Sequence, residues 1–157
     1  MIQRVQTLYL MVVTLLMVVT LCCPLVFVCV DGQQLTLSAF TISDAEGVLS
    51  YASAWLGVIL VVTTLLPFVT IFLYKNRQLQ IRLCGVECAL LVGSLILVAA
   101  FTYALCNNIF ADFDLGWENI AFRFPIILPL VSVVLTVLAM RAILRDELLV
   151  RSLDRIR

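Results

Sequence analysis

Residues 51–82 read YASAWLGVILVVTTLLPFVTIFLYKNRQLQIR, an apolar run without a charge that ends at a short basic segment. The apolar run, Tyr51–Tyr74, has 24 residues, and an α-helix needs about 20 apolar residues to cross a bilayer. The run that follows, Leu83–Cys106, is equally long. The basic segment between them therefore predicts a tight connector that joins two antiparallel membrane-spanning helices.

Two further apolar runs, Thr7–Val30 and Pro125–Met140, lie on either side of this pair. The chain is 64% hydrophobic and only 13% charged, whereas about half the residues of an ordinary soluble domain are apolar. A soluble helical bundle would also need a polar face on each helix, and these runs have none. We therefore predict an all-α membrane protein: a four-helix transmembrane bundle in one domain, residues 1–157. The expected spans are about 7–30, 51–74, 83–106 and 124–143, followed by a cytoplasmic tail, 144–157.

The charged residues are sorted between the two sides of these spans. Only Arg123 among the ten basic residues falls on the side where six of the ten acids lie. The other nine basic residues share the opposite side: Arg4, Lys75, Arg77, Arg82, Arg141, Arg145, Arg151, Arg155 and Arg157. Because basic residues are retained in the cytoplasm, this pattern predicts a protein that spans a bilayer four times with both termini cytoplasmic.

The outer loop after the first run contains residues 34–42, QLTLSAFTI, in which apolar and polar residues alternate. This period of two is typical of a strand with one sheltered face. It predicts a small extracytoplasmic cap, either a short ribbon or an ordered loop, although no second strand is evident.

The third run carries Gly85, Ala89 and Gly93 at four-residue intervals. Small residues on one helix face let helices approach closely, so we interpret this stripe as a packing surface. Packing against another span of the same chain is the favoured interpretation, and packing against a second protein is the alternative.

The tail predicts an amphipathic cytoplasmic helix, because Leu149, Leu153 and Ile156 share one face. One interpretation places this helix at the inner headgroup surface, with its arginines on anionic lipid. The other makes it a docking helix for a cytoplasmic partner.

The sequence offers few groups for chemistry. Histidine is absent, and no phosphate-binding loop, nucleophile motif or metal-ligand pattern occurs. We therefore expect no catalytic residue, cofactor or metal site. The six cysteines permit a thiol–disulfide oxidoreductase that uses the four outer ones, although no Cys-x-x-Cys motif is present. These four are Cys22, Cys23, Cys29 and Cys106. A structural disulfide between Cys29 and Cys106 is a further alternative.

Glu87 is the one ionisable acid inside a predicted span, about one turn from its inner end. Charges within a bilayer are costly and often mark function. At this shallow depth, an ion pair with Arg4, Arg82 or Arg141 is the favoured interpretation. The alternative is a small ion or solute transporter gated around Glu87 and a kink at Pro67.

Three cytoplasmic segments resemble a bacterial family of small four-span membrane proteins that is known only as a domain of unknown function. These segments are Met1–Leu10, the connector Phe72–Cys84, and the tail, in Arg141–Ile143 and Asp146–Arg157. The likeness covers essentially the whole chain. It implies a bacterial inner membrane but no activity, and it directs attention to partners on the cytoplasmic side.

The hypothesis that follows is a non-enzymatic accessory or scaffold subunit that acts through its cytoplasmic connector and tail. Its expected partners are the lipid bilayer and a membrane or cytoplasmic protein, and no nucleic acid. The residues expected to make these interactions are Arg4, Lys75, Arg77, Arg82, Glu87, Arg145, Arg151 and Arg155.

Overall fold

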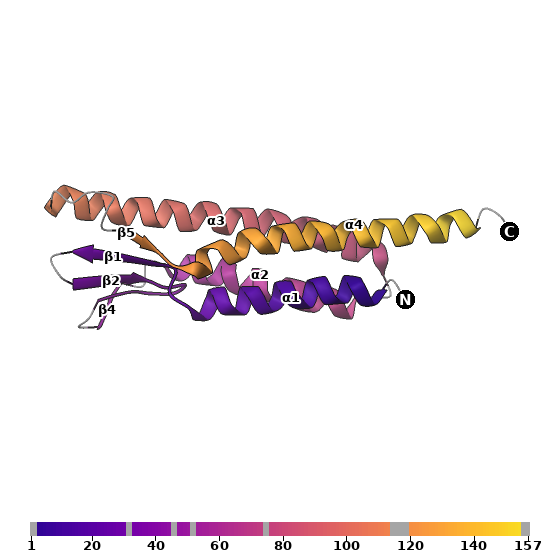
Figure 1. Ribbon diagram of the computed structural model, residues 1–157, viewed down its shortest axis with the longest axis horizontal. Coiled ribbons are helices and arrows are strands. Elements are labelled where there is room, and N and C mark those ends of the chain that lie inside the picture. The colour runs from indigo at the N-terminus through magenta and orange to yellow at the C-terminus, as the bar shows by residue number, and fades with distance from the viewer. Residues whose placement is uncertain are drawn as a thin grey trace.

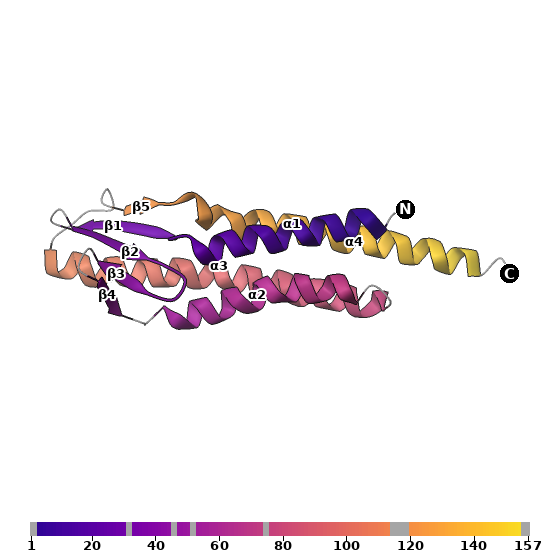
Figure 2. The ribbon, with the colours of Figure 1, turned by 90° about the horizontal axis from the view of Figure 1, so that it is seen from below.

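The computed structural model describes residues 3–30, 33–44, 47–50, 53–73, 76–113 and 120–154. This part of the chain contains α1 (Gln3–Cys22), α2 (Ala54–Phe72), α3 (Arg77–Phe113) and α4 (Leu128–Asp154), with a 3-10 turn, η2 (Phe124–Ile127), before α4. The helices form a ring in which α1 and α3 each pack against both α2 and α4 (Figures 1 and 2). The chain is therefore mostly helical, as predicted.

Three helical segments are long and apolar enough to cross a membrane: Ala54–Phe72, Gln78–Ala104 and Phe124–Leu148. A fourth, Gln6–Cys22, is apolar but shorter. Large hydrophobic side chains such as Leu15, Phe68, Ile96 and Val134 are exposed on the outside of the ring. Helices that are apolar both inside and outside match a lipid environment better than water.

The first predicted span, residues 7–30, is wrong in its outer third. Helix α1 ends at Cys22, and residues 26–30 form strand β1 (Val26–Val30). Pro24 has no amide hydrogen and cannot continue the hydrogen bonds of the helix. The sequence beyond it, Val-Phe-Val-Cys-Val, is β-branched and aromatic, a composition that favours a strand.

The other helices differ from the prediction mainly in length. Helix α3 runs from Arg77 to Phe113 rather than over 83–106, and its 37 residues span about 55 Å. The predicted connector Lys75–Arg82 is therefore largely helical. Helix α4 continues without interruption from its apolar part into the tail as far as Asp154, as the amphipathic pattern predicted.

The outer cap is a five-stranded antiparallel sheet. Besides β1 it contains β2 (Gln33–Leu37), β3 (Ile42–Asp44), β4 (Gly47–Ser50) and β5 (Ile120–Phe122), in the order β4-β3-β2-β1-β5. The predicted strand in residues 34–42 is confirmed, and its missing partner is β1, within the apolar run assigned to the first span. The sheet lies alongside the end of α3 that extends past the other helices (Figure 1).

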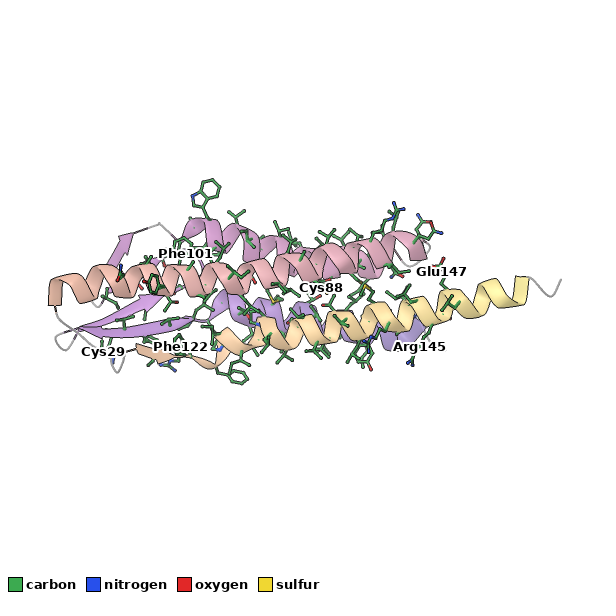
Figure 3. The ribbon with its side chains drawn as sticks, turned by 90° about the horizontal axis from the view of Figure 1, so that it is seen from above. Cys29, Cys88, Phe101, Phe122, Arg145 and Glu147 are labelled. Carbon is green, nitrogen blue, oxygen red and sulfur yellow. The ribbon has the colours of Figure 1, made fainter. Side chains whose placement is uncertain are left out.

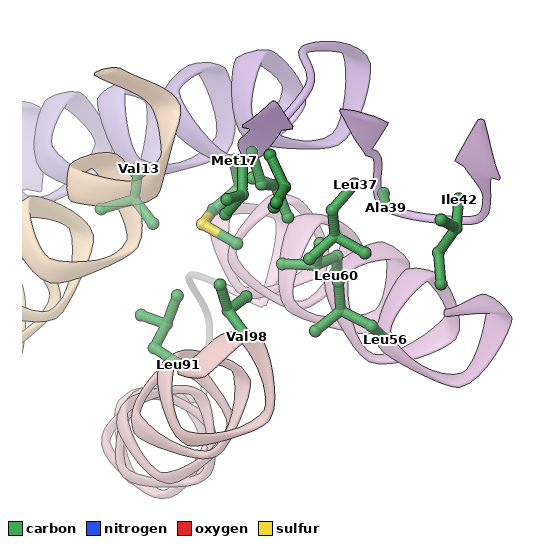
Figure 4. Close-up of a cluster of buried hydrophobic side chains, with 12 residues drawn as sticks. Val13, Met17, Leu37, Ala39, Ile42, Leu56, Leu60, Leu91 and Val98 are labelled. Carbon is green, nitrogen blue, oxygen red and sulfur yellow. The ribbon is translucent and has the colours of Figure 1, made fainter. Parts of the chain in front are cut away.

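The sheet is joined to the helices by a continuous apolar core. Leu37 and Ala39 from the cap are buried against Leu56 and Leu60 of α2, and Met17 of α1 lies in the same cluster (Figure 4). At Gly57 the approach of the two layers is so close that an added Cβ atom would overlap the Phe40 ring and lie 2.9 Å from the carbonyl oxygen of Ala39. The cap is therefore seated firmly on one end of the ring.

Candidate functional site

Glu87 lies in the interior of the helix ring, where its side chain is 0% exposed. Its Oε1 atom is 3.3 Å from the hydroxyl oxygen of Thr136 on α4, and Oε2 has no hydrogen-bond partner in the described structure. Arg82 and Arg141 are exposed; the side chain of Arg4 is outside the described part of the chain.

The favoured interpretation of Glu87 as an interfacial ion pair is therefore wrong for the described arginines. That interpretation assumed a helix that begins near Leu83. Because α3 begins at Arg77, Glu87 is ten residues, or about 15 Å, from the start of its helix. Glu87 is fully buried there, whereas Arg82 and Arg141 are exposed, and its Oε2 atom has no hydrogen-bond partner in the described structure.

Other polar side chains are buried between Glu87 and the end of the ring at which α1 and α3 begin. The Gln80 amide donates a 3.1 Å hydrogen bond to the carbonyl oxygen of Thr70, which ties α3 to α2. Gln6 on α1 is 5% exposed, and its Nε2 has no hydrogen-bond partner among the described residues. The interior is thus polar at several levels between Glu87 and the ends of α1 and α3.

The hydroxyl groups of the helix interiors bond back to their own helices, as serine and threonine side chains in helices commonly do. Thr14 and Thr20 donate to carbonyl oxygens four residues earlier, each at 2.9 Å. Thr63, Thr64, Ser94, Ser132 and Thr136 also donate to carbonyls of the preceding turn. These groups satisfy themselves locally and do not line an open path in the described structure.

The small-residue stripe on α3 does not face another helix of the chain. Gly85 and Ala89 are exposed, Gly93 is half-buried, and a Cβ atom added at either glycine would meet nothing within 4 Å. The favoured interpretation, in which this stripe packs against another span of the same chain, is therefore not supported by the described helices. Whether a second protein covers the stripe stays a prediction.

The described cysteines are not joined to one another. Cys22 and Cys29 are exposed free thiols, Cys23 is half-buried and free, and Cys84 is buried. Cys29, one half of the predicted Cys29–Cys106 disulfide, is a free thiol in the structure. The side chain of its predicted partner, Cys106, lies outside the described residues. Nothing in this arrangement singles out a reactive pair.

The basic residues predicted to make interactions are only partly described. Arg82 and Arg145 are exposed. Arg4, Arg77 and Arg151 lie in α1, α3 and α4, but their side chains are outside the described set, as are Lys75 and Arg155 altogether.

A groove of about 370 Å³ brings the predicted connector and tail together. Its walls come from the first turns of α3 and from α4, and they mix apolar and polar side chains. The lining residues are Gln78, Ile81, Arg82, Leu144, Glu147 and Leu148. Glu147 points toward α3, whereas Arg145 points away from it (Figure 3). Beyond this groove, α4 extends past the other helices (Figures 1 and 2).

Sequence reasoning found Glu87, Arg82 and the two segments of the groove, but it missed the polar partners Thr136, Gln80 and Gln6. One signal was available for Gln80. Gln80, Glu87 and Ser94 follow one another at seven-residue intervals, which places them on one face of a helix. All three are buried.

Together these features define a mostly helical protein with helices apolar and long enough for a membrane, a small sheet at one end and a groove at the other. The chain belongs to the family described as Domain of unknown function (DUF4293), which matches residues 2–156. The predicted resemblance to an uncharacterised domain family is therefore confirmed. No curated protein matches the chain.

Proposed function

We propose that this chain is an integral protein of a bacterial inner membrane and serves there as a non-enzymatic accessory or scaffold subunit. In this proposal it crosses the membrane four times with both ends in the cytoplasm. The bound partner is a membrane or cytoplasmic protein, held where the start of α3 meets α4.

The groove is the observation that carries the proposal. Leu148 on its wall is 66% exposed and directly follows three charged residues of α4, at the very end of the apolar segment Phe124–Leu148. An exposed leucine beside an arginine suits an amphipathic partner helix, whose apolar face would cover Leu148 and whose acidic residue would lie opposite Arg82. In the complex, the charged residues at the rim provide specificity, and the leucines that the partner covers provide affinity.

Helix α4 supports the same function through its length. Its 27 residues span about 40 Å, more than the hydrocarbon core of a bilayer. The excess projects on the side where α1 begins, beyond the ends of the other helices (Figure 2). A projecting helix can present a docking surface outside the hydrocarbon core of the bilayer.

Site-specific photo-crosslinking in native membranes tests this proposal. A photoreactive residue at position 148 should crosslink a stoichiometric protein partner. The same residue at position 130, where Leu130 is 56% exposed on the apolar belt of α4, should crosslink lipid. Leu148→Asp should remove the partner from mild-detergent preparations, while Leu130→Ala keeps it. A chain that is recovered alone, with no protein crosslinked from position 148, would overturn the proposal.

A further inference from the structure

We propose that Glu87 is a proton-binding site inside the helix ring. In this proposal its side chain is a neutral carboxylic acid in the folded protein. Its proton exchanges with the cytoplasmic side through the polar layer of Gln80 and Gln6. The ligand is the proton itself, and the site lies outside the groove proposed for protein docking.

Glu87 receives only a weak hydrogen bond from Thr136. The Thr136 hydroxyl donates to Glu87 Oε1 at 3.3 Å and to the carbonyl oxygen of Ser132 at 2.9 Å. Its single proton is therefore shared between two acceptors, and the carbonyl is the nearer one. A hydroxyl bonded to a carboxylate is usually shorter, at about 2.5–2.7 Å, so this contact does little to stabilise a charge on Glu87.

No described charge balances an ionised Glu87. Helix α2, Ala54–Phe72, has no ionisable residue. On α3 the titratable groups that interact with Glu87 are Cys84 and Cys88, and Arg82 is exposed. On α4 the nearest cation in sequence to Thr136 is Arg141, which is exposed, and the only ionisable side chain described on α1 besides Cys22 is Tyr9. A buried carboxyl without a cation takes up a proton rather than remain charged.

A metal ion fits this site poorly. No group of three or more histidine, cysteine, aspartate or glutamate side chains gathers in the described part of the chain. Hard cations such as Ca²⁺ take six to eight oxygen ligands, whereas Glu87 has one hydroxyl neighbour in hydrogen-bond range. A proton needs only one acceptor, so it is the ligand that this site can hold.

A carbonyl without its usual helical partner lies at about the depth of Glu87. Gln80 bonds the carbonyl of Thr70 across the antiparallel α2 and α3. Glu87 lies two turns after Gln80 on α3, and Thr63 lies two turns before Thr70 on α2. Because the two helices are antiparallel, Glu87 and Thr63 are at about the same depth. Because Pro67 has no amide hydrogen, the carbonyl of Thr63 lacks its usual helical partner. A protonated Glu87 is suited to such a carbonyl, and a carboxylate is not.

Labelling with dicyclohexylcarbodiimide, an apolar reagent that attacks protonated carboxyls, tests the proposal on the full chain in liposomes. Peptide mass spectrometry should find Glu87 modified, with labelling that falls as the pH rises. A water-soluble carbodiimide should modify Glu147, at the end of the ring, in preference to Glu87. Glu87 left unmodified at every pH by the apolar reagent, or modified equally by both, would overturn the proposal.

Infrared spectroscopy provides an independent measurement. The wild-type protein should show the carbonyl stretch of a protonated carboxylic acid, and Glu87→Gln should lose it while keeping its helical signal. An unchanged band in a folded Glu87→Gln variant would contradict the proposal. If that variant does not fold, the labelling of the wild-type chain still decides the question. After transfer to heavy water the carboxylic acid band should shift, and Gln80→Leu should slow this shift several-fold; an unchanged exchange rate would exclude the cytoplasmic route.

Discussion

Two glycines with opposite surroundings show how single residues shape this molecule. At Gly57 an added methyl group would overlap Phe40 and approach the Ala39 carbonyl, so Gly57→Ala must push the cap away from α2. Overpacking of this kind costs about 1–3 kcal/mol. At Gly93 the space is open, and alanine in a helix is favoured over glycine by about 0.5–1 kcal/mol. We expect Gly57→Ala to lower the thermal midpoint in detergent and Gly93→Ala to leave it unchanged or raise it. Equal shifts in the two variants would contradict this packing.

The sequence alone identifies only one of the two residues that meet at the Glu87 site. Glu87 stands out because it is an acid inside an apolar run. Its partner Thr136 is 49 residues away, and only the packing of α3 against α4 brings the two together. Its depth was misjudged because apolar composition marks where a helix enters lipid, whereas α3 begins earlier, at Arg77.

At the scale of elements, strand β5 shows how a short strand is held in the sheet. It is hydrogen-bonded only to β1 in the described sheet, and Arg123 directly after it lies over the Phe27 ring of β1, 4.4 Å from the ring centre. A cation over an aromatic ring contributes about 0.5–1 kcal/mol at exposed sites. A double-mutant cycle with Arg123→Ala and Phe27→Leu should therefore give a coupling energy of that size. The coupling is measured from the unfolding free energies in detergent, and additive effects would exclude the contact.

The elements that sequence patterns predicted are those whose residues keep a helical or strand pattern along their whole length. Helices α2 and α4 follow long apolar or amphipathic runs, and β2 alternates cleanly. Strand β1 was missed because it is continuous in hydrophobicity with α1. Val26 and Val28 face the core of the cap rather than lipid, and hydropathy does not distinguish the two. Pro24 was the local signal for the boundary.

At the scale of the whole molecule, the sheet and the groove lie at opposite ends, and α1 begins at the same end at which α4 finishes (Figure 2). The sorting of basic residues predicts that this end is cytoplasmic. Cys29 on the sheet and Arg145 on α4 are both exposed and mark the two ends. A pair of single-cysteine variants can therefore report the orientation: Cys29 alone, and Arg145→Cys alone, each with the remaining cysteines replaced by serine.

A membrane-impermeant maleimide should label Cys29 in spheroplasts and spare the Arg145→Cys variant. In inverted vesicles the pattern should reverse, because each orientation exposes only one end to the reagent. Detergent should make both sites reactive, which shows that each thiol is accessible when no bilayer shields it. Labelling of both sites from the same side would mean that an even number of membrane crossings, rather than three, separates the sheet from the end of α4. Reversal of the whole pattern would place the basic end outside, and the docking proposal at the groove would then lose its cytoplasmic partner.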